Sequence, residues 1–546
     1  MSTKLARDQV DGLVLSAEEF GAVGDGVTDD TSKFNLLNAF IASVAYPVEV
    51  RLEGTYLVDP LLTTTPLGSS YAALINLTTD GSMVTGTGTV KINSATNYTT
   101  PFSAGDEKYW SVVQINANNC QCKDFGFDGN GTHTASGYNP AVVNIRWQHV
   151  ASFGVIGTHR KGNKVIGCNG TDFGGQAVSF QFQDSARILA NNFDKHSGMG
   201  VSVGNDPQVA FNSSSGCYDA PYPLNGSIVG GKVVYNYLDG NTNGSGIDIM
   251  GCSNTEVAHN YIKNAKGAGV LVSYSVQQTN ASNNVHVHHN IFETNAQFTG
   301  APVRGEVVIG SDTVRADNAT DVVVEHNTFI IDGSISANAD RCVIIDAGTH
   351  DVTVKANKVK GTANSNNRFA SILYDAENLK FISNKSQLAT QQLINVGAGT
   401  TNTLTSTSNE GIAVDPSGTL FPNVGVLQED GSTLYSVQKT IGTSAENILV
   451  LDFESGAFTY AVIEVQAVQS GEFRGVTLNR LTSRGYNAVS PTVVSNTVVE
   501  AQGTNPPLVT TAVASGQLTV KLNSVGASSV TELSIRVIGD SLGKVF

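Results

Sequence analysis

The sequence predicts an all-β protein whose central part is a parallel β-helix. An Asn follows a short β-like run at intervals within the range of about 20 to 50 residues that is typical of solenoid repeats. The runs are rich in Val, Ile, Phe and Thr, and they alternate with the period of two that marks a strand with one buried face. The repeated asparagines are Asn192, Asn236, Asn260, Asn290, Asn327, Asn357 and Asn384. We expect each Asn at a left-handed corner, with its amide bonded to the Asn one coil further on.

Composition excludes several classes of function. Only 14% of the 546 residues are charged, against about 25% in a typical domain, and the net charge is −15. This argues against nucleic acid as a partner and offers no basic patch for a membrane surface. The sequence shows neither a signal peptide nor an 18-residue apolar run, so we expect no membrane insertion and synthesis in a cytosol. The six cysteines lack the spacing of a zinc site and are expected in the core.

The N-terminal region is expected to close the first coil. Residues 1–17 are interpreted as a polar arm, and residues 18–60 as a capping motif with a helix. The motif FGAVGDGVTDDT is followed by an amphipathic stretch from Thr31 to about Val44, then by VEVRLEG and GTYLVD. Asp25, Asp29 and Asp30 suggest a metal cluster, but a turn and a helix cap explain them better.

These residues also resemble a known family. FGAVGDGVTDDT, the following helix and the later GTY element are similar to the opening of the pectate-lyase-like superfamily of right-handed parallel β-helices. That superfamily includes polygalacturonase relatives and bacteriophage tailspikes. The opening match covers about forty residues, and the Asn-marked repeats extend the resemblance to roughly residue 395. The resemblance implies a right-handed β-helix in which the opening stretch is not catalytic.

The β-helix is predicted over residues 61–395, with aligned pairs of inward side chains in successive coils. The longest interruption, from Gly204 to Gly231, contains Asp206 and Asp219 and is expected to be a functional loop. The inward pairs are Val143/Ile145, Val178/Phe180, Val201/Val203, Ile247/Ile249, Val270/Val272, Val307/Ile309, Val343/Ile345 and Ile372/Tyr374.

The C-terminal part has a different pattern. Residues 396–430 are rich in Gly, Thr and Ser, and they are expected to form a connector or final irregular coils. About seven alternating runs over residues 431–546 predict an antiparallel β-sandwich. By resemblance to phage β-helix proteins, this domain would serve trimerisation or carbohydrate binding.

Outward acidic residues are the strongest candidates for chemistry. Counting from the inward pairs, they form a predicted stripe on one side of the solenoid. Glycoside hydrolysis needs two carboxyl groups on either side of the bond, and stacked coils supply suitable spacings of about 5 or 10 Å. We expect Glu306 to be the acid, with Asp248 or Asp312 activating water. The predicted stripe consists of Asp248, Glu306, Asp312, Asp346 and Asp375.

Other residues are candidates for substrate binding. The tyrosines could hold sugars by their apolar faces, although Tyr274 fits inward packing equally well, and the arginines could orient hydroxyls or carboxylates. HVHHN, from His286 to Asn290, resembles a metal tract, but no acidic partner is adjacent in sequence, so neither a metal nor a cofactor is predicted. The substrate-binding candidates are Tyr218, Tyr222, Tyr274, Arg146, Arg304 and Arg315.

The resemblance implies a phage tailspike that depolymerises a bacterial surface polysaccharide, either O-antigen or capsule, by endoglycosidic hydrolysis. It also implies a homotrimer in the virion, assembled in the host cytoplasm and joined to the phage baseplate or tail by the N-terminal arm. Two alternatives stay open. One is a polysaccharide lyase acting by β-elimination, and the other is a spike that binds polysaccharide without cutting it.

Overall fold

The computed structural model describes most of the chain, in two compact units. One unit comprises residues 1–344 and 358–367, and the other comprises residues 345–357 and 368–546. No helix within the described ranges is long and apolar enough to cross a membrane. The described residues are 13–63, 72–94, 108–130, 145–155, 157–172, 174–276, 278–297, 305–310, 318–332, 341–362, 368–372, 376–388, 392–396, 404–414, 426–427, 433–441, 446–452, 459–469, 475–485, 492–503, 508–514, 517–523, 529–539 and 543–545.

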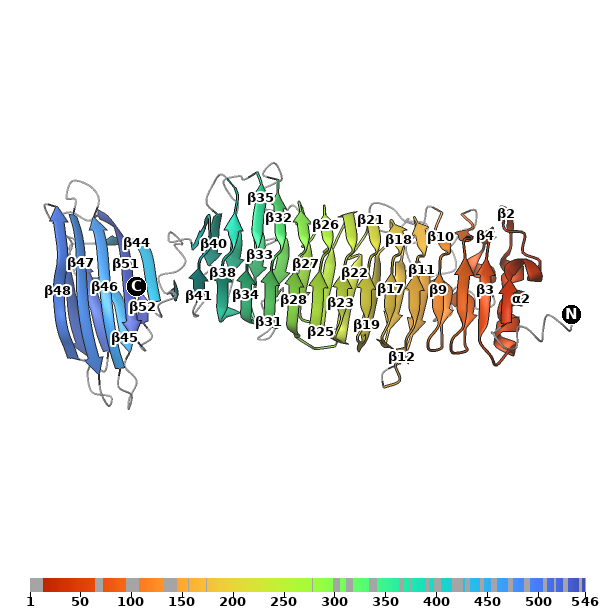
Figure 1. Ribbon diagram of the computed structural model, residues 1–546, viewed down its shortest axis with the longest axis horizontal. Coiled ribbons are helices and arrows are strands. Elements are labelled where there is room, and N and C mark those ends of the chain that lie inside the picture. Colours follow the sequence, from red (N-terminus) through yellow and green to blue (C-terminus); the bar gives the residue numbers. More distant parts are fainter. Residues whose placement is uncertain are drawn as a thin grey trace. The chain divides into compact units, whose positions relative to one another are not determined.

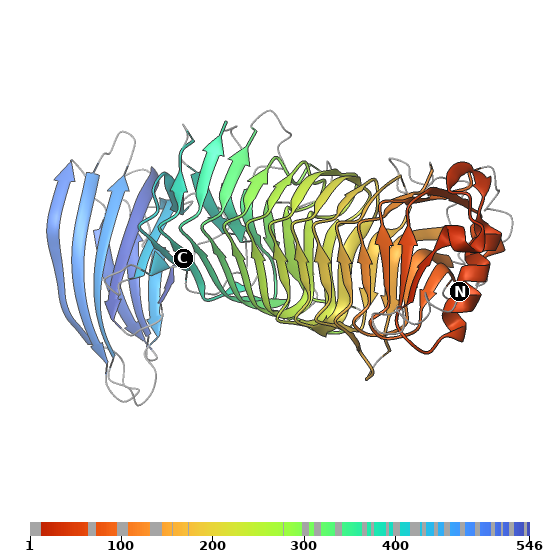
Figure 2. The same ribbon diagram turned by 45° about the vertical axis from the view of Figure 1, so that its right-hand side comes forward.

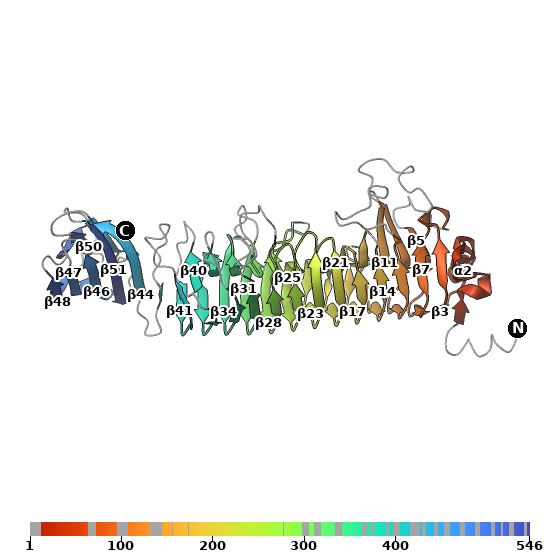
Figure 3. The ribbon, with the colours of Figure 1, turned by 90° about the horizontal axis from the view of Figure 1, so that it is seen from above.

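The first unit is a parallel β-helix with three strands per coil, so its strands form three parallel stacks (Figure 1). The first stack contains β5 (Ala72–Leu77), β8 (Lys108–Ile115), β11 (Ile145–Phe153), β15 (Gln176–Gln181), β19 (Gly198–Asn205), β22 (Tyr222–Val229), the first half of β25 (Ile247–Ala258), β27 (Val270–Ser273), β30 (Val307–Ile309) and β33 (Arg341–Ile345). The second contains β1 (Leu13–Ser16), β3 (Val48–Leu52), β6 (Met83–Gly86), β9 (Gln121–Lys123), β13 (Lys164–Ile166), β17 (Arg187–Leu189), β20 (Gln208–Ala210), β23 (Lys232–Val234), the second half of β25, β28 (Ser282–His288) and β31 (Ala319–Glu325). The third contains β2 (Asp25–Asp29), β4 (Thr55–Val58), β7 (Thr89–Ile92), β10 (Gly126–Asp128), β14 (Asn169–Thr171), β18 (Asn192–Asp194), β21 (Ser213–Cys217), β24 (Tyr237–Asn241), β26 (Tyr261–Lys263), β29 (Ile291–Glu293), β32 (Thr328–Ile331) and β35 (Lys358–Gly361). Seen from above, β17, β23 and β28 follow one another along one face (Figure 3).

The expected helix is α2 (Thr31–Ser43), and it lies across the N-terminal end of the coils (Figure 2). Asp29 Oδ1 accepts a hydrogen bond from the Thr31 backbone N at 2.9 Å, while Asp30 accepts from the backbone of the preceding loop. Asp25 accepts from the backbone N of Val27 and of Thr28, as expected of a turn. Asp30 occupies the N-cap position of α2, but its side chain makes no capping bond there, so the capping bond comes from Asp29 instead. Part of the predicted arm is wrong, because β1 pairs with β3 and belongs to the solenoid. Four short elements complete this unit: the 3-10 helices η1 (Ala17–Phe20) and η2 (Pro60–Leu62), and the paired strands β12 (Arg160–Lys161) and β16 (Gln183–Asp184).

Apolar side chains from the stacked strands fill the interior. Ile247 pairs with Val270, and Val270 pairs with Val307 one coil further on. All three are fully buried, as are Ile249 and Val272. The predicted inward pairs of these coils are confirmed, because parallel strands in register place equivalent residues over one another. Val203 departs from the prediction: it is half-buried, with a φ of 59° at a bulge in β19. Val143 and Tyr374 lie outside the described residues.

A ladder of buried asparagines runs along one corner of the first unit. Each Nδ2 donates to Oδ1 of the next Asn at 2.9 to 3.0 Å, and each also donates to a strand carbonyl. The prediction is corrected in two respects. The first marked residue is Asn191 rather than Asn192, and the left-handed φ belongs to the residue before each Asn. The ladder residues are Asn191, Asn212, Asn236, Asn260, Asn290 and Asn327.

The stretch from Gly204 to Gly231 forms a regular coil, so its interpretation as a long loop is wrong. Within it, β20, β21 and β22 pair in parallel with strands of the coils on either side. Asn212 is the ladder residue of this coil and fills the gap that the sequence pattern left before Asn236.

The second unit begins with further parallel coils. The strands are β34 (Thr349–Lys355), β36 (Arg368–Ile372), β37 (Ala376–Glu377), β38 (Leu379–Ile382), β39 (Lys385–Ser386), β40 (Gln392–Val396), β41 (Leu404–Thr407), β42 (Ile412–Val414) and β43 (Val426–Leu427). A second run of the ladder joins Asn357, Asn384 and Asn409. Parallel pairing of β38 with β41 and of β40 with β42 extends the coils into the predicted connector.

Antiparallel strands follow in two sheets. One has the order β44 (Thr433–Ile441), β51 (Ser529–Gly539), β46 (Thr459–Gln469), β47 (Gly475–Gly485) and β48 (Thr492–Gly503). The other has the order β49 (Leu508–Ala514), β50 (Gln517–Asn523), β45 (Glu446–Asp452) and β52 (Gly543–Val545). The predicted alternating runs correspond to β44, β45, β46, β47, β48, β50 and β51, while β49 and β52 were not predicted. The packing of these sheets as a sandwich stays a prediction.

Candidate active site

Asp248 is the best-placed acidic residue on the first unit. It is the second residue of β25, where its neighbours in the stacked strands are Pro223 and Leu271. Because Ile247 and Ile249 point into the core, Asp248 points away from it, as predicted. The side chain is half-buried, and its Oδ1 is shielded from solvent with no hydrogen-bond partner among the described residues.

The surroundings of Asp248 favour its protonated form. Burial raises the pKa of its carboxyl to about 7, and the negative charge of Asp219 contributes to the rise, while a hydrogen bond with Ser245 opposes it. Desolvation and like charge both destabilise a carboxylate. A carboxyl with this pKa can donate a proton near neutral pH, which is the property required of a general acid.

Asp219 supplies the second carboxylate. It lies in the turn between β21 and β22, one coil before Asp248, and its side chain is exposed. A Cβ placed on Gly244 would lie only 2.3 Å from Asp219 Oδ1, so this oxygen lies directly against the backbone beside Ser245. Tyr218, a predicted sugar-binding residue, precedes Asp219 and is half-buried. The sequence identified Asp219 as part of a loop but gave no sign of its proximity to Asp248.

Glu306 does not face solvent, so its predicted place in the outward stripe is wrong. Only 3% of its surface is exposed. Oε1 accepts from the backbone N of Asn295 at 3.1 Å, and Oε2 accepts from Asn295 Nδ2 at 2.6 Å. Glu306 stands in the corner before β30, where strand alternation no longer sets the direction of a side chain. Burial raises the pKa of this carboxyl to about 7, and the bonds from Asn295 oppose the rise.

Tyr222 is also corrected, because it is fully buried and cannot present a face to a sugar. Tyr222 is the first residue of β22, and its side chain points into the core. Its hydroxyl donates a hydrogen bond to the Tyr237 carbonyl at 2.5 Å. Tyr274 follows β27 and is half-buried, which leaves both of its interpretations open.

The remaining predicted residues are incompletely described. Asp346 belongs to the second unit, where it is half-buried and its Oδ1 accepts from the Ala347 backbone N at 2.8 Å. Arg146 lies in β11, but its side chain is outside the described part of the structure. Four predicted residues lie wholly outside the described residues: Asp312, Asp375, Arg304 and Arg315.

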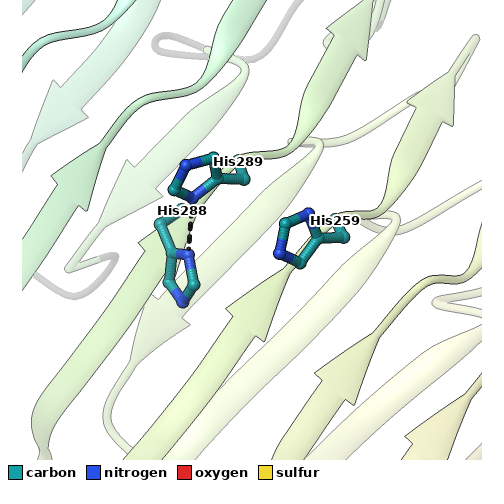
Figure 4. Close-up of side chains that lie close together, drawn as sticks. All are labelled: His259, His288 and His289. Atoms are coloured by element: carbon teal, nitrogen blue, oxygen red, sulfur yellow. Dashed lines mark hydrogen bonds between the residues drawn. The ribbon is translucent and has the colours of Figure 1, made fainter.

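One further group of side chains could hold a metal. Ring nitrogens of His259, His288 and His289 lie within 4.8 Å of one another on the surface of two adjacent coils (Figure 4). His288 and His289 belong to HVHHN, whereas His259 comes from a different repeat. No acidic residue is adjacent to HVHHN in sequence, but two are close in space: Glu256 and Glu325, from the coils on either side, contact His288 and His286.

Comparisons with known proteins agree with this fold. A family model described as a right handed beta helix region matches residues 153–318. The tailspike protein of E. coli bacteriophage HK620 in complex with a pentasaccharide is similar at 13% identity, covering 98% of this chain and 94% of that chain, with a TM-score of 0.52. A single mutant of that tailspike aligns at 14% identity over 98% and 95%, with a TM-score of 0.54. No curated protein sequence matches. The right-handed parallel β-helix is therefore confirmed, and this chain shares it with phage tailspikes.

Proposed function

We propose that this chain is a tailspike-like protein that binds a bacterial surface polysaccharide and hydrolyses it at internal glycosidic bonds. Asp248 is the proton donor in this proposal, and Asp219 is the second carboxylate. Asp248 replaces Glu306 as the proposed acid, because both carboxyl oxygens of Glu306 are buried and accept hydrogen bonds from Asn295.

One observation carries the proposal. Asp248 is a carboxyl on a strand of a rigid solenoid, directed away from the core, with a pKa raised to about 7 beside a second acid. Glycoside hydrolases commonly use two carboxyl groups, one of which holds its proton near neutral pH. The similar fold of a tailspike solved with a pentasaccharide supports polysaccharide as the ligand class.

The remaining expectations belong to the same proposal. A tailspike-like protein would act at the bacterial surface as part of a virion, as a homotrimer attached through its N-terminal residues. The low content of charged residues and the absence of a strongly basic composition fit a neutral or weakly charged glycan better than a polyanion.

The test is product analysis. The purified chain is incubated with lipopolysaccharide and capsule from a panel of Gram-negative strains, and the products are labelled at the reducing end and weighed by mass spectrometry. We expect oligosaccharides of whole repeating units, each carrying one added water and a new reducing end.

Two other outcomes would replace the proposal. Products lighter by one water, with the absorbance of an unsaturated sugar, would indicate a lyase. Tight binding without products on every strain would indicate an adhesin. In either case Asp248 would lose its assigned role as the acid of a hydrolysis.

A further inference from the structure

Five rings form a continuous stack on the surface of the first unit, one ring per coil. Each stands directly before a ladder Asn and has a positive φ, which turns the ring outwards while the Asn turns inwards. Successive ring centroids lie 5.0, 4.7, 5.2 and 5.1 Å apart. Since the rings cover one another's faces, their edges are what the stack presents to solvent. The rings, in order, are Phe211, Tyr235, His259, His289 and His326.

From His259 onward the rings of the stack are imidazoles, and a further imidazole outside the stack, that of His288, lies beside them. His288 is the last residue of β28 and precedes His289, so the two side chains meet at the corner. Their Nδ1 atoms lie 2.9 Å apart. His259 comes from the preceding coil, and Figure 4 shows its ring turned toward the other two.

We propose that His259, His288 and His289 form a binding site for one divalent transition-metal ion of the zinc type, which links two coils of the solenoid. Neutral imidazole is a preferred ligand of zinc, nickel and copper ions. Two Nδ1 atoms 2.9 Å apart, each about 2.1 Å from one ion, would make an N–metal–N angle of about 90°, so the two rings would have to move slightly apart to reach the tetrahedral geometry of zinc. Small rotations of the exposed His259 and His289 rings would complete the three-nitrogen set.

A carboxylate holds one of the ligands in the required tautomer. His288 Nε2 lies 3.3 Å from Glu256 Oε1. A carboxylate only accepts hydrogen bonds, so Nε2 carries the proton in the neutral ring and Nδ1 keeps its lone pair for a metal. Lys232 contacts the other oxygen of Glu256 at 3.0 Å and keeps this carboxylate in place.

The close approach of His288 and His289 also determines what binding requires. Their Nδ1 atoms lie at hydrogen-bond distance, so one of them carries a proton in the neutral pair. When an ion binds both Nδ1 atoms, this proton moves to Nε2 of the same ring, and both Nδ1 lone pairs become free for the ion.

This inference does not depend on the proposed hydrolysis, because the stack and Asp248 use different residues. Binding is measured directly on the full-length chain without a histidine tag. Zn²⁺ is titrated at pH 7.5 by calorimetry, and Co²⁺ is followed by its visible absorption, which reports nitrogen ligands in the inner sphere. We expect one ion per chain to bind at this site.

Substitutions distinguish this site from casual binding to surface histidines. His259→Asn and His289→Asn keep the left-handed corner, since Asn tolerates positive φ, and each should weaken Zn²⁺ binding by more than about tenfold. Glu256→Gln removes only the support of His288 and should weaken it by about tenfold. The matched control is His326→Asn, which lies at the same corner and in the same stack but outside the three-residue site, and it should change the affinity less than twofold.

Thermal melting gives an independent measure, because an ion that binds only the folded chain raises the melting temperature. Zn²⁺ should raise it in the unaltered chain and in His326→Asn but not in His259→Asn, and a chelator should reverse the rise. The proposal would be overturned by the absence of stoichiometric Zn²⁺ binding. It would also be overturned if the His259, His289 and His326 variants all bound equally well.

Discussion

Asp248 and Glu306 show how surroundings decide the role of a carboxyl group. Burial raises the pKa of both to about 7. Both oxygens of Glu306 accept hydrogen bonds from Asn295, whereas Oδ1 of Asp248 has no partner within the described structure. A carboxyl whose acceptors are occupied stabilises the fold. The unpaired Oδ1 of Asp248 is shielded from solvent, so a substrate can meet this half-buried carboxyl only at its other oxygen.

The pH dependence of catalysis follows from Asp248. A general acid must hold its proton, so the rate of polysaccharide cleavage should fall as the pH rises above about 7, the pKa of this carboxyl. Initial rates of reducing-end formation between pH 5 and 9 would measure the profile. An activity that increases steadily through this range would be incompatible with Asp248 as the proton donor.

Glu306→Gln should affect stability rather than chemistry. The carbonyl oxygen of the new amide can still accept one hydrogen bond from Asn295. Its NH₂ group faces the second Asn295 donor and cannot accept from it. One buried donor then goes unsatisfied, and we expect the free energy of unfolding to fall by about 1–3 kcal/mol. Denaturant unfolding would measure this, with the exposed Glu53→Gln as a control expected to change it by less than about 0.5 kcal/mol. Loss of cleavage without loss of stability would restore Glu306 as a catalytic candidate.

Side-chain direction could be predicted from the sequence only inside strands. The alternation that places Ile247 and Ile249 in the core correctly turned Asp248 outward. Glu306 lies one residue before β30, where the chain bends and the period of two no longer applies. The pairing of Asp219 with Asp248 could not be predicted, because it depends on recognising the intervening coil.

At the level of elements, the corner between the second and third strand stacks organises the solenoid. A residue with positive φ turns its side chain outward, and the following Asn turns inward to bond with the next coil. The residue with positive φ therefore makes the bend, and the Asn that follows it bonds to buried backbone groups that the bend leaves unpaired.

Asn260 offers a direct test of the ladder. Its Nδ2 donates to the Val233 carbonyl and to Asn290, and its Oδ1 accepts from the backbone N and Nδ2 of Asn236. Asn260→Ala leaves several buried groups without partners, at about 1–3 kcal/mol each. We expect a clear loss of thermal stability in calorimetric melting. Asn283→Ala, an exposed change in β28, serves as the matched control. Equal melting temperatures for the two variants would contradict a structural role of the ladder.

The repeating coils could be predicted because apolar alternation and an Asn mark recur together. The coil at 204–231 was missed because its third strand is Ser-rich and two prolines, Pro221 and Pro223, flank the start of β22, a composition typical of loops. Its ladder residue, Asn212, follows Phe211 rather than a Val or Ile run. Stacking against neighbouring coils overrides these local preferences.

For the whole molecule, the right-handed β-helix is a scaffold, and such folds carry many different activities. Its advantage for a polysaccharide is a long, rigid flank on which side chains from successive coils keep fixed spacings. The proposed pair draws on this property, since Asp219, in the turn between β21 and β22, and Asp248, in β25, come from adjacent coils whose strands pair in register.

The most direct test compares binding with cleavage in Asp248→Asn. The substitution keeps the shape of the side chain but removes its transferable proton. We expect the variant to bind its polysaccharide with nearly unchanged affinity and to lose cleavage by at least about 100-fold, the usual contribution of a general acid. Cleavage at the native rate by a correctly folded Asp248→Asn protein would contradict the central role given to this residue.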